Sequence, residues 1–239
     1  MPAALASGVQ NAAMTERSLV DLAEAVGDEL ALRLRIPCDI LNVHRLNDSR
    51  ARIYSSLRYG AFLLAYAPLE SFFTQLTGYA DRLNGRALPL NLDKIQRELA
   101  LKWPDARFQT NLWEGRTRQQ PTRAGHRSEW AFLKGVRLKD YLSDMKRLRD
   151  LLSHGADPVR VTNDSRTLWE VRGGRSMRLM GVEGFIQFAE DLAEQALLEA
   201  GVPLERVPTW PEPQRTGISL SGLPALPNRD RLARRQGSQ

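Results

Sequence analysis

The chain has 239 residues, of which 42% are apolar, enough for the core of one domain of roughly 200 residues with tails. Its single cysteine, Cys38, excludes an internal disulfide bond and a cysteine-cluster zinc site. No apolar run is long enough to cross a membrane and no signal peptide is visible, so we expect a soluble cytoplasmic protein. The net charge of +6 favours polyanionic partners, although an arginine excess also arises from a GC-rich genome.

The amino-terminal region divides into two parts. Residues 1–14 are small and polar without periodicity, and we expect them to be disordered. Apolar residues then recur at helical spacing and predict a helix over 18–35 that ends before Pro37.

A second helix is predicted from about residue 47 or 48 to about residue 83. Pro68 lies inside this pattern and is expected to kink or split the helix, because proline removes one backbone hydrogen bond. The pair Asn84-Gly85 is expected to end it.

A short third helix is predicted over 92–101. The following segment, 103–127, has no periodicity, holds two prolines and carries a net charge of about +3, so it is interpreted as a long basic loop. Four arginines of this loop are candidates for RNA binding: Arg116, Arg118, Arg123 and Arg127.

The next predicted helix begins at Ser128 or Val136 and ends at His154, followed by Gly155 as its cap. A period of two then predicts a hairpin from strands 159–161 and 167–171 around a turn at 163–165, closed by the glycines at 173 and 174.

The last predicted helix covers about 182–200. From 202 to 239 the chain is rich in proline and arginine, and most of it is expected to be disordered. The sequence therefore predicts a mainly α fold: one domain over 15–201 with four or five bundled helices and a small hairpin before the last helix.

The common catalytic motifs for nucleotide binding or metal-dependent hydrolysis are absent. The histidines, His44, His126 and His154, are far apart in the sequence, and no pair has the helical spacing of metal ligands. The sequence therefore indicates neither a metal site nor a cofactor.

The stretch "RDLLSH" (149–154) offers an arginine and a histidine near the end of a helix. On a regular helix Arg149 and His154 point about 140° apart. They converge on one phosphate only if the chain turns at Gly155, or if two copies meet across a two-fold axis. An ordinary structural role is also open, because a histidine cation at a helix carboxyl terminus is favourable in itself.

This R-x4-H pattern, with Asp150 after the arginine and Gly155 after the histidine, resembles the motif of the HEPN superfamily of small helical proteins. The resemblance extends to the apolar helix at 58–76 with its embedded Glu70, and it covers about residues 45–200. The long loop, the hairpin and Pro68 depart from the family's pattern or elaborate on it.

HEPN proteins that keep this motif are typically metal-independent endoribonucleases of toxin–antitoxin, phage-defence and RNA-processing systems, and they generally work as dimers. The resemblance implies that Arg149 and His154 are catalytic, that Asp150 orients a neighbour, and that Glu70 supports the arginine. It implies RNA and a second copy as partners, with an antitoxin or a nucleotidyltransferase as further ones. A purely structural ion pair between Glu70 and Arg149 stays open.

The chemistry suits these residue types. RNA carries its own nucleophile, the 2′-hydroxyl, and a histidine with a pKa near 6.5 can transfer protons at neutral pH. An arginine can hold phosphate oxygens while charge builds up on them. Two other functions remain open: a non-catalytic HEPN-like dimeric scaffold, and a basic regulator that binds nucleic acid through 103–127 and the tail.

Overall fold

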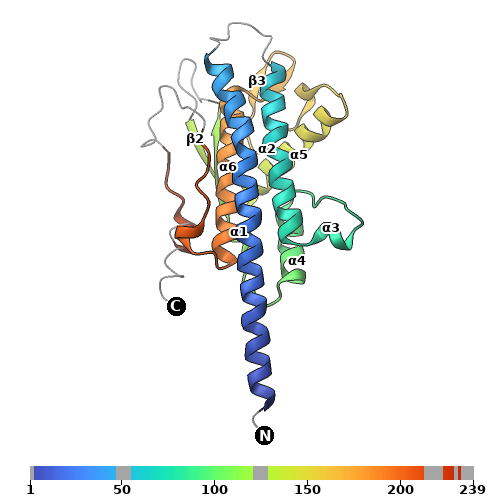
Figure 1. Ribbon diagram of the computed structural model, residues 1–239. Coiled ribbons are helices and arrows are strands. Elements are labelled where there is room, and N and C mark those ends of the chain that lie inside the picture. Colours follow the sequence, from blue (N-terminus) through green and yellow to red (C-terminus); the bar gives the residue numbers. More distant parts are fainter. Residues whose placement is uncertain (1–2, 47–54, 121–128, 213–222, 229–230, 233–239) are drawn as a thin grey trace.

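The computed structural model describes residues 3–46, 55–120, 129–212, 223–228 and 231–232 (Figure 1). The mainly α fold is confirmed, and two small antiparallel hairpins accompany the helices. The helices are α1 (Ala3–Leu46), α2 (Ser55–Leu76), α3 (Tyr79–Arg82), α4 (Leu92–Lys102), α5 (Val136–Ser153) and α6 (Leu179–Glu199). The hairpins are β1 (Glu114–Gln119) with β2 (Glu129–Lys134) and β3 (Trp169–Val171) with β4 (Gly174–Ser176). Single 3-10 turns are η2 (Thr110–Leu112), η3 (Pro158–Arg160) and η4 (Leu204–Arg206).

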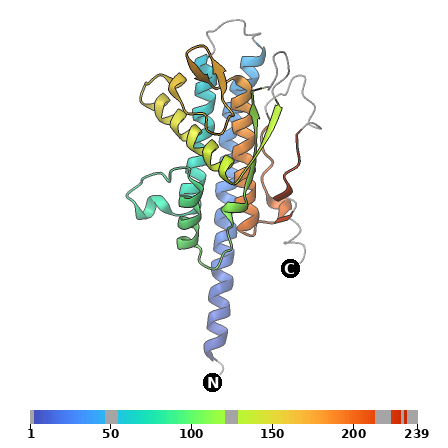
Figure 2. The same cartoon turned by 180° about the vertical axis from the view of Figure 1, so that it is seen from behind.

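Helix α6 is the centre of the molecule. Every residue from Gly181 to Leu198 is buried, because α1 and α2 cover one side of the helix and β1 covers another (Figures 1 and 2). Aromatic rings fill the seam between α2 and α6, where Phe185 lies 4.9 Å from Phe62 and 5.9 Å from Tyr66 between ring centroids. Removing these apolar side chains from water stabilises the fold through the hydrophobic effect.

Strand β1 crosses α6 at very short range. A Cβ atom on Gly184 would lie 2.3 Å from the backbone nitrogen of Arg118, and one on Gly115 would lie 2.5 Å from the ring of Phe188. The side-chain amide of Gln195 accepts from the backbone N–H of Glu114 at 3.0 Å and donates to its carbonyl at 2.6 Å. A side chain of α6 thus satisfies the strand edge that β2 leaves open.

Helix α1 is longer than the sequence predicts. It continues through Pro37 to Leu46, and it includes residues 3–14, for which disorder was expected. The proline removes one N–H and frees the carbonyl of Arg33, whose side chain is exposed and whose backbone can be hydrated. Pro37 itself is buried, so packing against the body offsets the lost hydrogen bond.

Helix α2 is also uninterrupted at its proline. Pro68 lies inside the helix, and the break comes at Gly78, whose φ of 58° begins the separate turn α3. Asn84 and Gly85 have φ values of 52° and 77° and end this region as predicted. The predicted start of the second helix, at residue 47 or 48, lies outside the described residues.

The prediction of a basic loop over 103–127 is wrong for residues 103–120, which the structure describes. This segment contains η2 and β1, and β1 pairs with β2 in the register Thr117 to Ala131. Of the two predicted starts of the next helix, Val136 is confirmed, because α5 begins there and residues 129–134 form β2 instead. Helix α4 agrees with the prediction, and the side chain of Asn91 caps it by accepting from Lys94 N at 2.9 Å.

The hairpin before the last helix is present, and β3 lies within the predicted strand 167–171, but its partner strand is β4 rather than 159–161. Segment 159–161 belongs mostly to η3, and the turn lies at Arg172-Gly173 rather than at 163–165. The Asn163 side chain instead bonds to the backbone N–H and carbonyl of Leu168, at 2.9 and 3.1 Å. The backbone N–H and carbonyl of Leu168 are thereby satisfied without a partner strand.

The described part of the tail is packed rather than disordered. Val202 and Leu226 are buried, and Trp210 packs against the core. Asn228 donates from its backbone to Glu114 at 3.0 Å and from its side chain to Gln195 at 2.6 Å. The chain after α6 therefore folds back along α6 and β1. None of the described helices is long and apolar enough to cross a membrane.

Candidate functional site

An ion pair joins two helices at the centre of the candidate site. Arg149 on α5 donates from Nη2 to Oε1 of Glu70 on α2 at 2.7 Å. The side chains are 28% and 16% exposed, so solvent screens the pair only in part. Burial raises the pKa of Glu70 above its ordinary value, although the Arg149 charge opposes this change.

A second carboxylate binds the other amino group of the same arginine. Nη1 of Arg149 lies 3.0 Å from Oδ1 of Asp150, whose Oδ2 accepts from Lys146 at 2.6 Å. Burial alone would raise the pKa of Asp150, but the Lys146 hydrogen bond and the charges of Arg149, Lys146 and His154 outweigh it and lower that pKa. The guanidinium is therefore held in one orientation by two anionic groups.

The aromatic ring of Tyr66 packs against the guanidinium of Arg149. The Arg149 carbon Cζ lies 5.2 Å from the ring centroid of Tyr66, which is 1% exposed. Tyr66 precedes Glu70 by one helical turn on α2, so both face the arginine. Burial, aided by the Glu70 charge, raises the pKa of the Tyr66 hydroxyl, and the phenol stays protonated at neutral pH.

His154 caps the carboxyl end of α5 and is exposed. Gly155, with a φ of 66°, turns the chain, and Ala156 N donates back to the Leu151 carbonyl at 2.9 Å. The structure thus brings Glu70, Arg149 and Asp150 into contact and leaves His154 open to solvent at the adjacent helix end. Tyr66 and Lys146 were not predicted as site residues, although each lies four positions from one that was.

The two described arginines that were predicted to bind RNA are largely buried and contact residues of the protein itself. Arg116 is 12% exposed and pairs with the buried Asp191 at 2.5 Å. Arg118 is 3% exposed, and its Cζ lies 4.7 Å from the Trp130 ring centroid. Both arginines serve the contact of β1 with the protein interior, whereas Arg123 and Arg127 lie outside the described residues.

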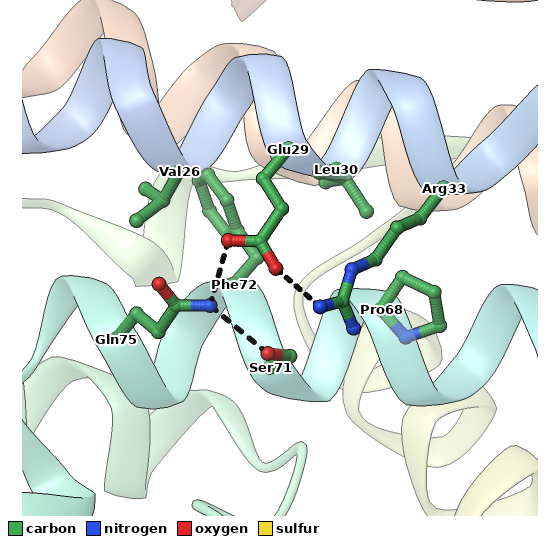
Figure 3. A pocket seen from close by; sticks show the side chains of 8 residues that line it. All are labelled: Val26, Glu29, Leu30, Arg33, Pro68, Ser71, Phe72 and Gln75. Atoms are coloured by element: carbon green, nitrogen blue, oxygen red, sulfur yellow. Dashed lines mark hydrogen bonds and ion pairs between the residues drawn. The ribbon is translucent and has the colours of Figure 1, made fainter.

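Figure 3 shows a depression between α1 and α2. Its polar groups bind one another: Glu29 pairs with Arg33 at 2.5 Å and accepts from Gln75 at 3.1 Å, and Gln75 donates to Ser71 at 3.1 Å. It is a packing seam between two helices. Its lining residues are Val26, Glu29, Leu30, Arg33, Pro68, Ser71, Phe72 and Gln75.

Within the described ranges, no group of three or more His, Cys, Asp or Glu side chains is placed to hold a metal ion. No family model, curated protein or solved structure matches the chain. The site is therefore interpreted from its own geometry.

Proposed function

We propose that the protein is a metal-independent RNA endonuclease of the HEPN type that acts as a toxin or phage-defence effector. The observation that carries the proposal is the orientation of Arg149 by Glu70, at 2.7 Å, next to the exposed His154 at the end of the same helix. An arginine held by carboxylates and a solvent-accessible histidine are the groups that phosphodiester transfer requires.

In the proposed reaction the RNA 2′-oxygen attacks the adjacent phosphorus, and the bond from phosphorus to the 5′-oxygen breaks. The products are a 2′,3′-cyclic phosphate and a 5′-hydroxyl. His154 transfers protons to or from these oxygens, and Arg149 stabilises the charge on the phosphate in the transition state. DNA is not a substrate, because it lacks the 2′-hydroxyl.

The proposed active form is a homodimer. The five-residue spacing of Arg149 and His154 separates their directions by about 140° on one regular helix. A two-fold axis beside the end of α5 would place the histidine of each copy near the arginine of the other. An antitoxin or a nucleotidyltransferase is the proposed regulatory partner.

A cleavage assay on mixed cellular RNA in EDTA tests the proposal. Wild-type protein and Ser153→Ala are expected to cleave, whereas His154→Ala is expected to be inactive. Both variants change exposed residues, so the fold is retained and a loss of activity reports on chemistry. Equal cleavage by wild type and His154→Ala would contradict the assignment.

A non-catalytic scaffold is the second candidate, and one observation favours it. Both amino groups of Arg149 already pair with carboxylates, Glu70 and Asp150, so a phosphate would have to compete with them. This alternative predicts the same dimer without any cleavage of RNA. A dimer by ultracentrifugation, inactive in the assay above, would support it.

A further inference from the structure

One end of the molecule collects arginines from segments far apart in the sequence. Arg58 lies near the start of α2, and Arg178 directly precedes α6. The β3–β4 hairpin lies beside this end of α2 (Figures 1 and 2), and Tyr59 Oη lies 3.4 Å from Ser176 Oγ. The neighbouring segment adds further arginines: Arg160, Arg166, Arg172 and Arg175.

The pair of Arg58 and Arg178 is electrostatically unusual. Neither guanidinium forms an ion pair with a carboxylate among the described residues. The buried Nε of Arg58 has no hydrogen-bond partner there. Burial lowers the pKa of Arg58, and the charge of Arg178 lowers it further, although Tyr59 opposes both. Two like charges repel each other, and no carboxylate of the described residues pairs with either one, so a bound anion would stabilise this end of the protein.

Two of the nearby carboxylates have partners in the same segment, and that of Asp164 is exposed. Glu170 pairs with Arg175 at 3.1 Å, and Asp157 accepts from the backbone of Val159 at 3.1 Å. The carboxylate of Asp144 is buried and accepts from Ser165. Asp144 thus anchors the arginine-bearing segment to α5. Segment 157–178 holds five arginines against the three carboxylates of Asp157, Asp164 and Glu170, so it keeps a net positive charge.

We propose that Arg58 and Arg178 bind backbone phosphates of the same RNA strand that is cleaved beside Arg149. This inference rests on the proposed function and supplies it with a substrate-binding surface, in place of the internally paired Arg116 and Arg118. Arg58 precedes Glu70 by about three helical turns, or roughly 18 Å along α2. A stacked strand advances about 3.4 Å per nucleotide, so at least about five nucleotides connect the arginine pair with the candidate site.

The test measures binding separately from cleavage. The probe is a labelled single-stranded RNA of roughly 20 nucleotides, longer than the span above, with 2′-O-methyl groups that prevent cleavage. Its affinity is measured by fluorescence anisotropy over a range of salt concentrations. The variants are Arg178→Gln, which changes an exposed side chain, and Arg58→Gln/Arg178→Gln. The control, Arg86→Gln/Arg107→Gln, removes two exposed arginines near α3 and α4.

The double variant is expected to bind at least about tenfold more weakly, and the slope of log affinity against log salt should become shallower by about 1.4, or 0.7 per phosphate contact. Arg178→Gln alone should cause about half of the slope change, and the control should keep most of the affinity. An equal loss of affinity in the control would mean that only net charge matters, and it would overturn the proposal. The proposal would also be overturned if the double variant bound RNA as tightly as wild type, or if wild type did not bind RNA.

The two proposals can fail separately. If wild type cleaves RNA through His154 but the arginine variants bind and cleave normally, the nuclease stands and this surface is wrong. If no cleavage occurs but the uncleavable RNA binds through Arg58 and Arg178, the surface stands and the nuclease is wrong.

Discussion

Glu70 Oε1 and Arg149 Nη2 lie 2.7 Å apart although 79 positions separate the residues in the chain. Burial raises the pKa of Glu70 more than the arginine lowers it. Ionised Glu70 therefore adds no net stability to the fold, as is common for partly buried ion pairs. We infer that the pair orients the guanidinium rather than stabilising the contact between α2 and α5.

Replacing Glu70 by glutamine separates these roles. The amide keeps the shape of the carboxylate, so the free energy of unfolding in urea should change by less than about 1 kcal/mol. The neutral amide holds the guanidinium less firmly, and cleavage of RNA should fall at least about tenfold, equivalent to about 1.4 kcal/mol. Glu29→Gln, which affects the more exposed pair with Arg33, is the control and should leave cleavage intact. A large loss of stability in Glu70→Gln would indicate a structural role.

The same residue predicts a pH dependence of stability. Because the folded protein binds the Glu70 proton more tightly than the unfolded chain does, the contribution of Glu70 to stability falls as the pH rises from 4.5 through its raised folded-state pKa. Glu70→Gln has no carboxyl group at this position to ionise, so its stability does not fall for this reason. Denaturation at several pH values should show the variant gaining stability relative to wild type as the pH rises, with no further change above that pKa. The opposite trend would mean that the Arg149 charge outweighs burial.

The space around two helical glycines predicts opposite effects of replacing them by alanine. Gly184→Ala places a Cβ 2.3 Å from the Arg118 backbone nitrogen and should destabilise the protein by about 3 kcal/mol. Gly60→Ala, within α2, meets nothing within 4 Å and should stabilise it by about 0.5 to 1 kcal/mol. Thermal or urea unfolding of both variants measures the difference. Equal effects would show that the two backbones can separate at little cost.

The pair of Arg116 with Asp191 predicts a structural rather than an RNA-binding role. Arg116→Gln leaves the carboxylate of Asp191, which is 1% exposed, without its cation and should destabilise the fold by about 3 kcal/mol. Lys139→Gln breaks the exposed pair with Asp93 and should change the free energy of unfolding by less than about 1 kcal/mol. If Arg116→Gln folds as stably as wild type but binds RNA more weakly, the structural interpretation is wrong.

Several features were predictable because they depend on neighbours in the sequence. Helices α4 and α6 follow from apolar residues at helical spacing, and Gly155 ends the region of α5 because its φ of 66° suits glycine. The hairpin β1–β2 was missed because the arginines of β1 conceal the alternation of a strand. The burial of Arg118 could not be predicted, because it depends on Trp130 of the partner strand β2.

The sequence by itself determined the helical class, the positions of most helices, and the candidate residues Arg149 and His154. The expected contact of Glu70 with Arg149 is present. Only the tertiary structure decided that Arg116 is internal and that the tail packs on α6. The physical reason is the range of the interactions. Helix periodicity and caps act within a few residues, whereas an ion pair or a strand edge depends on a partner that distant segments bring into place.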